Sequence, residues 1–111
     1  MFEVSRQGAV DVISGREPLN VETGGPLREL VKSSCLSGQP RVVINLQDIP
    51  LIDSAGLETL LDCRDECVHR MGVLQLAAPN RLCRDILRVT GVDAQFAVFD
   101  NVLSAVGSFA L

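Results

Sequence analysis

Residues 49–57 read Ile49-Pro50-Leu51-Ile52-Asp53-Ser54-Ala55-Gly56-Leu57, and they join a predicted buried strand to a predicted helix. The strand is the apolar run at 42–46, and apolar residues at close to helical spacing predict the helix over about 55–71. Pro50 fits inside neither element and marks the connection between them. The pattern therefore places Ser54 at or next to the helix N-cap, over the unpaired backbone N–H groups of the first turn.

The start of this helix is suited to a negatively charged group. A helix N-terminus carries a partial positive charge, so a phosphate on Ser54 would be tolerated there. Gly56 has no side chain that could obstruct a group approaching the amides of the first turn. A serine in this place can also act simply as an N-cap. The residues alone therefore leave two interpretations open, a modified serine and a capping serine.

The bulk composition indicates a single domain. The chain has 111 residues, of which 47% are hydrophobic, enough for one core. A net charge of −4, a pI near 4.8 and the absence of Trp and Tyr argue against nucleic-acid binding. The N-terminus lacks the apolar core of a signal peptide, and no apolar run approaches the roughly 18–20 residues that cross a bilayer. We expect a cytoplasmic protein without membrane insertion, whose four cysteines stay reduced.

Strands and helices are predicted to alternate along the chain. Strands 2–6 and 9–13 form a hairpin, and residues 15–25 are predicted as a loop because they hold three Gly and one Pro. Pro26 is then expected at the first position of a helix that Ser37-Gly38-Gln39-Pro40 ends. The later elements are strand 42–46, helix 55–71, strand 73–77, helix 81–90, strand 96–99 and helix 101–108. This order predicts an α/β fold with a mixed, mostly parallel five-stranded sheet, an initial β-hairpin and about four helices.

Neither catalysis nor metal binding is predicted. A serine nucleophile needs a base within hydrogen-bond reach, and the only histidine, His69, lies roughly 22 Å from Ser54 along the same predicted helix. Cys63 and Cys67 are four residues apart, whereas a compact zinc knuckle uses a pair two residues apart. We expect no enzyme activity, no cofactor and no metal, with Cys63, Cys67 and Cys83 in the core.

The sequence around Ser54 resembles the phosphorylation loop of STAS domains, which occur in anti-anti-sigma factors and in the cytoplasmic tails of sulphate transporters. The matching motif is Asp53-Ser54-Ala55-Gly56-Leu57 after the turn Asp48-Ile49-Pro50. Three later segments resemble family elements in the right order. Gly72-Val73-Leu74-Gln75-Leu76 resembles the fourth strand, and Pro79-Asn80 with residues 86–92 resembles the third helix and its exit turn. Phe96-Ala97-Val98-Phe99-Asp100 resembles the last strand. Residues 1–111 are therefore identified as one STAS domain.

The first third of the chain departs from the family pattern. Family members usually carry a Gly-Glu-Leu-Asp run before the first helix, with its acidic residue facing the serine loop. Here the stretch reads Gly15-Arg16-Glu17-Pro18-Leu19-Asn20-Val21-Glu22, and either Asn20 or Glu22 stands near the aspartate position. We expect residues 15–25 to border the Ser54 loop, because the loops that follow parallel strands emerge at the same end of a sheet.

The resemblance implies an anti-sigma factor antagonist that regulates transcription and is switched by phosphorylation. In its unmodified form such a protein binds an anti-sigma factor with a histidine-kinase-like ATPase fold, and a sigma factor is released. The partner, a serine kinase, then phosphorylates the serine, here Ser54, and the complex dissociates. The residues expected to contact the partner are Asp53, Ser54, Ala55, Gly56, Leu57, Glu58, Asn20 and Glu22.

Other interpretations remain open. A STAS domain can also be a constitutive structural subunit of a lipid-transport complex of the ABC type, or of a signalling complex, without a phosphorylation switch. A weak homodimer is a further alternative. The helix after Ser54 is also predicted to have an acidic outer side, which is either solvated or faces a basic partner; it consists of Glu58, Asp62, Asp65 and Glu66.

Overall fold

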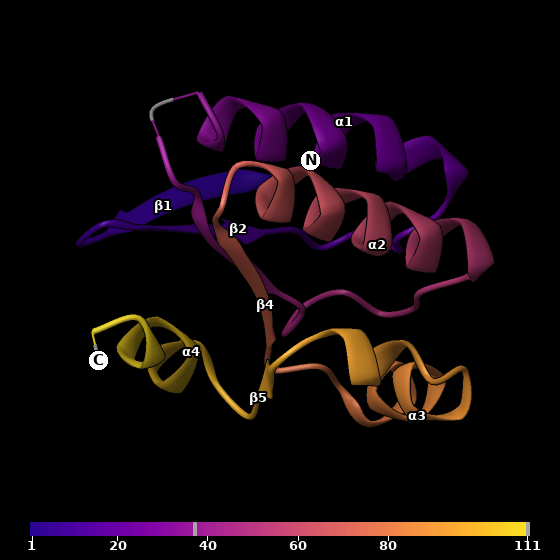
Figure 1. Cartoon of the computed structure of the whole chain (residues 1–111). Coiled ribbons are helices and arrows are strands. Elements are labelled where there is room, and N and C mark those ends of the chain that lie inside the picture. The colour runs from indigo at the N-terminus through magenta and orange to yellow at the C-terminus, as the bar shows by residue number, and fades with distance from the viewer. Residues whose placement is uncertain (37, 111) are drawn as a thin grey trace.

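A five-stranded sheet with helices packed against it forms the protein in a computed structural model that describes residues 1–36 and 38–110 (Figure 1). The strands are β1 (Glu3–Gln7), β2 (Val10–Ser14), β3 (Arg41–Asn45), β4 (Val73–Ala77) and β5 (Val98–Phe99). The helices in the described residues are α1 (Val21–Ser34), α2 (Ser54–His69), α3 (Arg81–Val89) and α4 (Val102–Ser108), with a short 3-10 helix η1 (Val92–Gln95) before β5. The predicted α/β class, mixed sheet and initial hairpin are confirmed.

The strands lie side by side in their order along the chain, a point that the sequence left open. β1 and β2 are antiparallel, whereas β2, β3, β4 and β5 are parallel to one another. Each parallel connection steps in the same direction, and such crossovers are almost always right-handed, so their helices fall on one face of the sheet. Side chains of α1, α2 and α3 accordingly share one core, whereas α4 packs in a second core.

The two cores follow from the alternation of side chains along each strand. Ile13, Ile44 and Leu76 point into the larger core with α1, α2 and α3. Val12 and Val43 point the other way, into the smaller core that Ala105 of α4 completes. Every residue of β1 is exposed, so this strand forms an open edge of the sheet.

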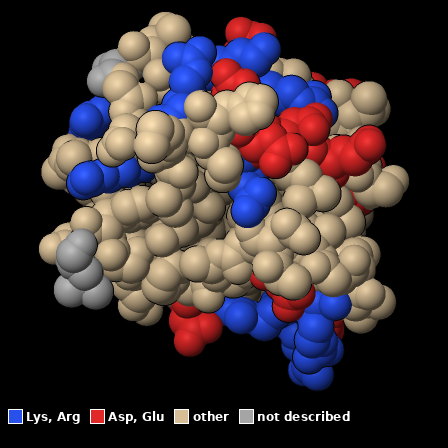
Figure 2. Space-filling view, in the orientation of Figure 1, with Lys and Arg blue, Asp and Glu red and all other residues tan. Residues whose placement is uncertain are grey.

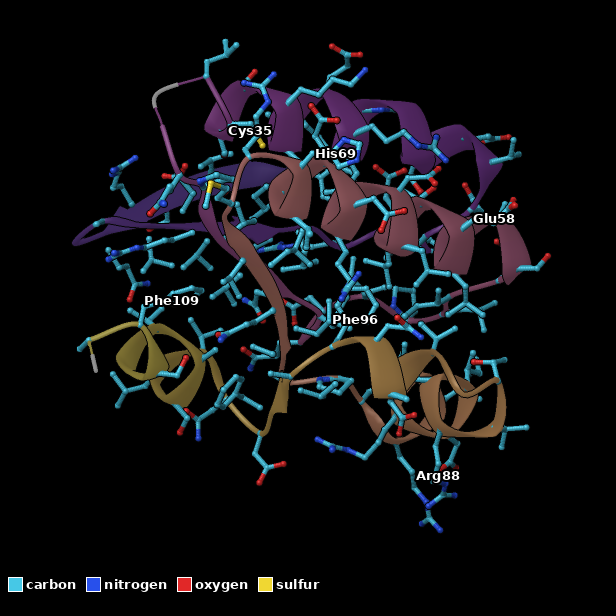
Figure 3. The ribbon with its side chains drawn as sticks, viewed as in Figure 1. Cys35, Glu58, His69, Arg88, Phe96 and Phe109 are labelled. Carbon is cyan, nitrogen blue, oxygen red and sulfur yellow. The ribbon has the colours of Figure 1, made fainter. Side chains whose placement is uncertain are left out.

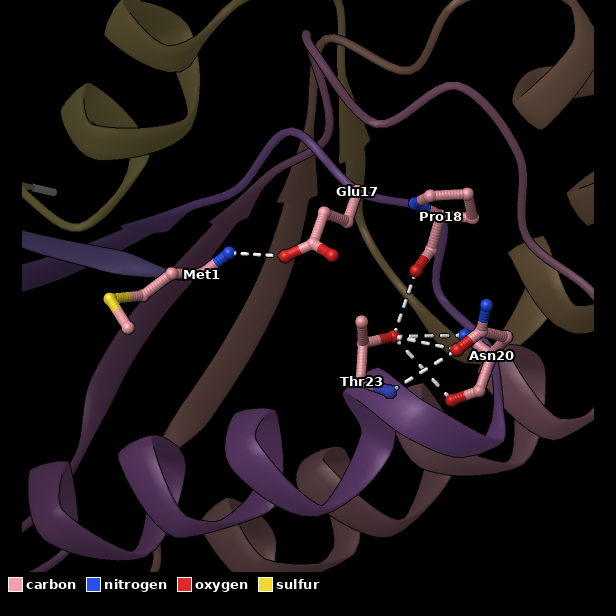
Figure 4. A network of polar contacts seen from close by, with 5 residues as sticks. All are labelled: Met1, Glu17, Pro18, Asn20 and Thr23. Atoms are coloured by element: carbon pink, nitrogen blue, oxygen red, sulfur yellow. Dashed lines mark hydrogen bonds and ion pairs between the residues drawn. The ribbon is translucent and has the colours of Figure 1, made fainter.

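The first helix begins five residues earlier than predicted, at Val21 rather than Pro26. Asn20 is its N-cap: the Asn20 Oδ1 accepts hydrogen bonds from the backbone N–H groups of Glu22 (2.9 Å) and Thr23 (3.2 Å) (Figure 4). The Thr23 Oγ1 in turn accepts a bond from the Asn20 N–H at 3.0 Å. This reciprocal cap satisfies the donors of the first turn and starts the helix inside the predicted loop.

The Gly-Gly-Pro sequence that suggested a loop lies inside α1. Gly24 is buried, and a Cβ there would lie 2.5 Å from the Oγ1 of Thr59 on α2. Glycine therefore lets the two helices approach each other closely. Pro26 is exposed and removes one backbone donor from the helix. The cap and the contact with α2 outweigh the low helix propensity of this segment.

The other elements lie close to their predicted positions, with ends that differ by at most two residues. The first helix was expected to end at residues 37–40. The structure ends α1 at Ser34 with Cys35 as C-cap, and Ser37 lies outside the described residues. No helix in residues 1–36 or 38–110 is long and apolar enough to cross a membrane.

Candidate functional site

Two loops meet at the carboxyl ends of β2 and β3, where α1 and α2 begin. The backbone N–H of Leu19 donates to the carbonyl of Leu51 at 2.9 Å, and the N–H of Asp53 donates to the carbonyl of Leu19 at 3.1 Å. These bonds form a short parallel bridge between Leu19 and Ile52. The segment before α1 therefore borders the Ser54 loop, as the sequence predicted, and the N-termini of α1 and α2 lie together (Figure 1).

Asp53, and not Ser54, caps α2. The Asp53 Oδ1 accepts a hydrogen bond from the backbone N–H of Gly56 at 2.9 Å, and its carbonyl accepts one from the N–H of Leu57, also at 2.9 Å. Ser54 is the first residue of the helix and is exposed. Its hydroxyl makes no hydrogen bond with any described residue. A capping role therefore does not explain the serine, and its hydroxyl is accessible from solvent.

Gly56 has a different role from the one that the sequence suggested. It is buried, and a Cβ there would lie 2.3 Å from the carbonyl oxygen of Leu19 and 2.7 Å from its carbonyl carbon. The first turn of α2 thus packs directly on the backbone of the neighbouring loop. Gly56 holds the two loops in contact, and its N–H is already bonded to Asp53, so the expectation of an open approach for an anion at this residue is wrong.

Asn20 and Glu22 stand at the start of α1, beside this loop. The side chain of Asn20 is engaged in the cap of its own helix, and Glu22 is exposed in the first turn. Neither side chain forms a hydrogen bond or an ion pair with residues 53–58, as far as the described residues show. The acidic side chain that faces the serine loop in the family pattern therefore has no direct replacement here.

α3 begins at the same edge; this helix was predicted, but its contact with the Ser54 loop was not. Asn80 caps α3 by accepting a bond from the N–H of Cys83 at 2.8 Å, and its Nδ2 donates to the carbonyl of Ile49 at 3.1 Å. The Ser54 loop is thereby tied to the start of α3. An asparagine just before a predicted helix was the signal for the cap, but its second contact depends on the tertiary fold.

Exposed apolar side chains stand at the three helix starts. Val21 at the start of α1 is 80% exposed, Leu51 in the Ser54 loop 42%, and Leu82 in the first turn of α3 52%. We call these three residues the apolar rim. Apolar side chains that stay exposed beside polar ones are typical of surfaces that bind other proteins. The sequence gives no signal for this group, because each of the three residues stands alone in it.

The outer side of α2 carries less unpaired negative charge than predicted, because most of its acidic residues pair with arginines. Asp62 pairs with Arg28 of α1 at 3.0 Å, Asp65 lies 3.6 Å from Arg64, and Glu66 lies 4.0 Å from Arg70. Figure 2 shows acidic and basic side chains interleaved over this part of the molecule. Of the four predicted acids only Glu58 has no ion pair among the described residues. Among the described residues, the acidic side chains of α2 and its N-cap that lack an ion pair are Glu58 and Asp53, and both lie near Ser54.

All four cysteines are buried, free thiols, as expected for core residues. Desolvation raises the pKa of Cys63 to about 12 and also raises the pKa of Cys67, Cys35 and Cys83. No group of three or more potential metal ligands is found in the part of the chain that the structure describes. These thiols are therefore protonated at neutral pH and form part of the core.

The raised pKa of Cys63 predicts a loss of stability at alkaline pH. An unfolded thiol titrates near pH 9, so below that pH both states keep the proton and this group has no effect. Above pH 9 the unfolded chain loses the proton while the folded protein keeps it, up to about pH 12. The free energy of unfolding should then fall by up to about 1.4 kcal/mol per pH unit for this thiol. Urea unfolding of wild type and Cys63→Ala with reductant tests this, because the variant should show the shallower fall between pH 9 and 10.5.

Asp53 offers a test that separates capping from charge. Asp53→Ala should lower the free energy of unfolding by about 1 kcal/mol, because it removes the N-cap acceptor. Asp53→Asn should stay close to wild type, because asparagine caps equally well without the charge. Thermal unfolding followed by circular dichroism measures both. Equal losses for the two variants would mean that the carboxylate charge matters here beyond its hydrogen bond.

The comparison with protein-family models gives one match, to the STAS domain model, over residues 1–105. The chain belongs to the STAS domain family. The match includes β1 to β5 and all of the candidate site residues. A search of curated proteins found no matching sequence relative.

Solved structures share the STAS fold at low sequence identity. A Thermotoga maritima protein assigned as an anti-sigma factor antagonist is 20% identical over 96% of this chain and 92% of its own, with a TM-score of 0.88. The unphosphorylated form of the anti-sigma factor antagonist SpoIIAA is 16% identical over 99% of this chain and 96% of its own, with a TM-score of 0.82. A Wolinella succinogenes protein of the sulfate transporter family is 17% identical over 92% and 85%, with a TM-score of 0.78. At these identities the comparisons establish the fold.

Proposed function

We propose that this STAS domain is an anti-sigma factor antagonist whose binding to its partner is switched by phosphorylation of Ser54. Unmodified, it binds an anti-sigma factor with a histidine-kinase-like ATPase fold, frees a sigma factor and so regulates transcription in the cytoplasm. One observation supports the switch above the others. Ser54 is exposed with an unbonded hydroxyl at the start of α2, while Asp53 supplies the cap that a serine would otherwise provide.

The proposed partner surface is the edge where α1, α2 and α3 begin. It contains the predicted contact residues of the Ser54 loop. Asn20 and Glu22 at the start of α1 are joined to it through the Leu19–Ile52 bridge. The exposed residues Ser54 and Glu58 are available for direct contact, whereas Gly56 and Leu57 are buried and would act by shaping the loop. The apolar rim would supply the hydrophobic contacts around them.

Phosphorylation would change the charge of this edge more than its structure. A phosphoserine adds about −1.5 to −2 charges at neutral pH. On the free protein the group would face water at a helix N-terminus, where negative charge is tolerated. In an interface it would be desolvated beside Asp53 and Glu58, neither of which has a described arginine or lysine partner. The added repulsion and desolvation would release the partner.

The chemistry of the switch would belong to the partner. The γ-phosphoryl group of ATP would move to the Ser54 Oγ, with ADP as the leaving group and the hydroxyl proton taken up by a base of the kinase. The STAS domain would contribute an accessible hydroxyl on a rigid helix start. His69 lies at the opposite end of α2 and is exposed, so it offers Ser54 no general base.

Affinity capture from the native cytoplasm tests the proposal. The tagged wild-type protein should retain a protein with a histidine-kinase-like ATPase fold, and addition of ATP should release it. Ser54→Ala should retain the same protein and hold it when ATP is added. Retention of an ABC-type ATPase in place of the kinase, unaffected by ATP, would instead favour a structural subunit of a transport complex.

That structural subunit is the alternative function. The similarity to a sulfate transporter family protein supports it, because the same fold occurs there in another setting. In this case Ser54 would be an ordinary surface residue and its replacement by Asp would leave assembly unchanged. A weak homodimer is compatible with either function and is tested by sedimentation at increasing concentration.

Charge reversal at Glu22 tests the second loop of the proposed surface. Glu22→Lys should weaken partner binding about three- to tenfold, because Glu22 is exposed at the edge that includes Ser54. Glu29→Lys is the matched control, since Glu29 is exposed on the same helix about two turns further from this edge. Calorimetric titration with the captured kinase compares the two variants. If both bind as wild type does, the start of α1 is not part of the interface.

A further inference from the structure

Three of the four thiols meet between the C-terminal ends of α1 and α2. Cys35, Cys63 and Cys67 are each at most 1% exposed. Cys35, the C-cap of α1, and Cys67 of α2 belong to one buried core cluster, and the backbone carbonyl of each accepts a hydrogen bond from Arg70. Cys63 lies one helical turn before Cys67. Figure 3 shows Cys35 at one end of the helix pair and Glu58 toward the other. The thiol cluster is therefore remote from the Ser54 edge.

Arg70 links the backbones of Cys35 and Cys67 independently of their sulfurs. The Arg70 guanidinium lies 3.5 Å from the carbonyl oxygen of Cys35, to which it donates a hydrogen bond. Arg70 also donates its backbone N–H to the carbonyl of Cys67 at 3.0 Å. The residue that ends α2 thus contacts both cysteines. α1 and α2 also pack along their length in one core, which keeps the two residues near each other.

We propose that Cys35 and Cys67 form a dithiol that closes to an intramolecular disulfide when the protein meets a small disulfide oxidant such as glutathione disulfide. One thiol attacks the oxidant as a thiolate, forms a mixed disulfide and releases one glutathione. The second then displaces the other glutathione from the mixed disulfide. Two protein thiols and one glutathione disulfide thereby give one protein disulfide and two glutathione molecules, which receive the two protons.

Cys35 is the thiol that reacts first. It is the C-cap of α1, and the next residue, Leu36, is 78% exposed, so fraying of one helix end uncovers the sulfur. Cys67 lies within α2 and becomes accessible only with a larger opening. Burial keeps both thiols protonated in the closed state, so the reaction is limited by this opening. In a reducing cytoplasm the pair stays reduced until oxidant accumulates.

The disulfide would stabilise the fold without altering the Ser54 edge. It joins two residues that are 32 positions apart in the sequence, and so restricts the unfolded chain. The folded protein already holds both residues in one core cluster, whereas the unfolded chain does not. We expect the effective concentration of the two thiols to be roughly 100-fold higher in the folded protein than in urea. The melting temperature should rise by about 5–15 °C on oxidation.

Tryptic mapping identifies the bond directly, because each cysteine falls in its own peptide. The peptides are 33–41 for Cys35, 42–64 for Cys63, 65–70 for Cys67 and 82–84 for Cys83. The folded protein is equilibrated in glutathione redox buffers, its free thiols are blocked in acid, and it is digested without reduction. A link between peptides 33–41 and 65–70 is the expected product, accompanied by the rise in melting temperature.

Variants complete the test. Cys67→Ser should abolish the link and the thermal shift, and Cys83→Ser, which changes a buried thiol outside the cluster, should retain both. If Cys67→Ser loses its circular dichroism spectrum, Cys35→Ser replaces it as the second variant. A link from 33–41 to 42–64, mixed glutathione disulfides alone, or four free thiols in the folded protein at high oxidant would each overturn the proposal.

Discussion

Ser54→Asp should weaken binding of the captured kinase at least tenfold, which corresponds to about 1.4 kcal/mol. The reason is the negative charge that would be buried in the interface with the kinase. Carboxylates at 53 and 58 already stand at this edge without a described cationic partner, and a further charge at 54 must be desolvated among them. The variant should fold normally, because negative charge at a helix N-terminus is worth about 0.3–1 kcal/mol in favour of the helix.

Ser54→Ala is the matched control for this experiment. Alanine removes the hydroxyl, which has no hydrogen bond to any described residue, and leaves the Asp53 cap in place. It should therefore bind the partner as tightly as wild type in calorimetry and have the same melting temperature. Equal affinities for Ser54→Asp and wild type would count against a phosphorylation switch and in favour of a structural subunit.

Gly56→Ala should lower the free energy of unfolding by about 1–3 kcal/mol, although alanine is the better helix former. The added Cβ would lie 2.3 Å from the carbonyl oxygen of Leu19, and because this neighbour is backbone it has little room to relax. The first turn of α2 should move away from the neighbouring loop, which weakens the bond from the Asp53 N–H to Leu19. Urea unfolding and hydrogen exchange of the Asp53 amide measure the two effects.

The control is the same change at another helical glycine. Gly25 is exposed on α1 and a Cβ there meets nothing within 4 Å, so Gly25→Ala should stabilise the protein by about 0.5–1 kcal/mol. Opposite signs for the two variants would establish that close packing, rather than helix propensity, requires Gly56. If Gly56→Ala were as stable as Gly25→Ala, the contact with Leu19 would not constrain the site.

The sequence predicted those parts of the fold that local patterns determine. Apolar runs bounded by turn residues located every strand to within two residues, and the Pro50 break located the start of α2. The order of the strands could not be derived in this way, because it depends on contacts between distant segments. The uniform order found here also explains why α1, α2 and α3 share one core.

The errors occurred where tertiary contacts override local preference. Gly24, Gly25 and Pro26 suggest a loop, but the Asn20 cap and the contact between Gly24 and Thr59 make them helical. The spacing of Asn20 and Thr23 was the available signal for the true helix start.

At the candidate site, the loop and its serine were predicted, but the division of roles within it was not. Asp53 rather than Ser54 caps the helix, and Gly56 packs against Leu19, a residue 37 positions away in the sequence. The apolar rim was missed because Val21, Leu51 and Leu82 come together only when three helix starts meet at one edge. Contacts over such separations cannot be derived from spacing within one element.

The most direct measurement is a phosphotransfer reaction between this protein and the captured kinase with ATP, followed by tryptic mapping. Ser54 lies in peptide 42–64, whose only other hydroxyl belongs to Thr59, which is 1% exposed and donates to the carbonyl of Ala55. We expect one phosphate per chain, on Ser54, together with dissociation of the complex. A complex that persists with ATP, or a phosphate on another residue, would contradict a phosphorylation switch at Ser54.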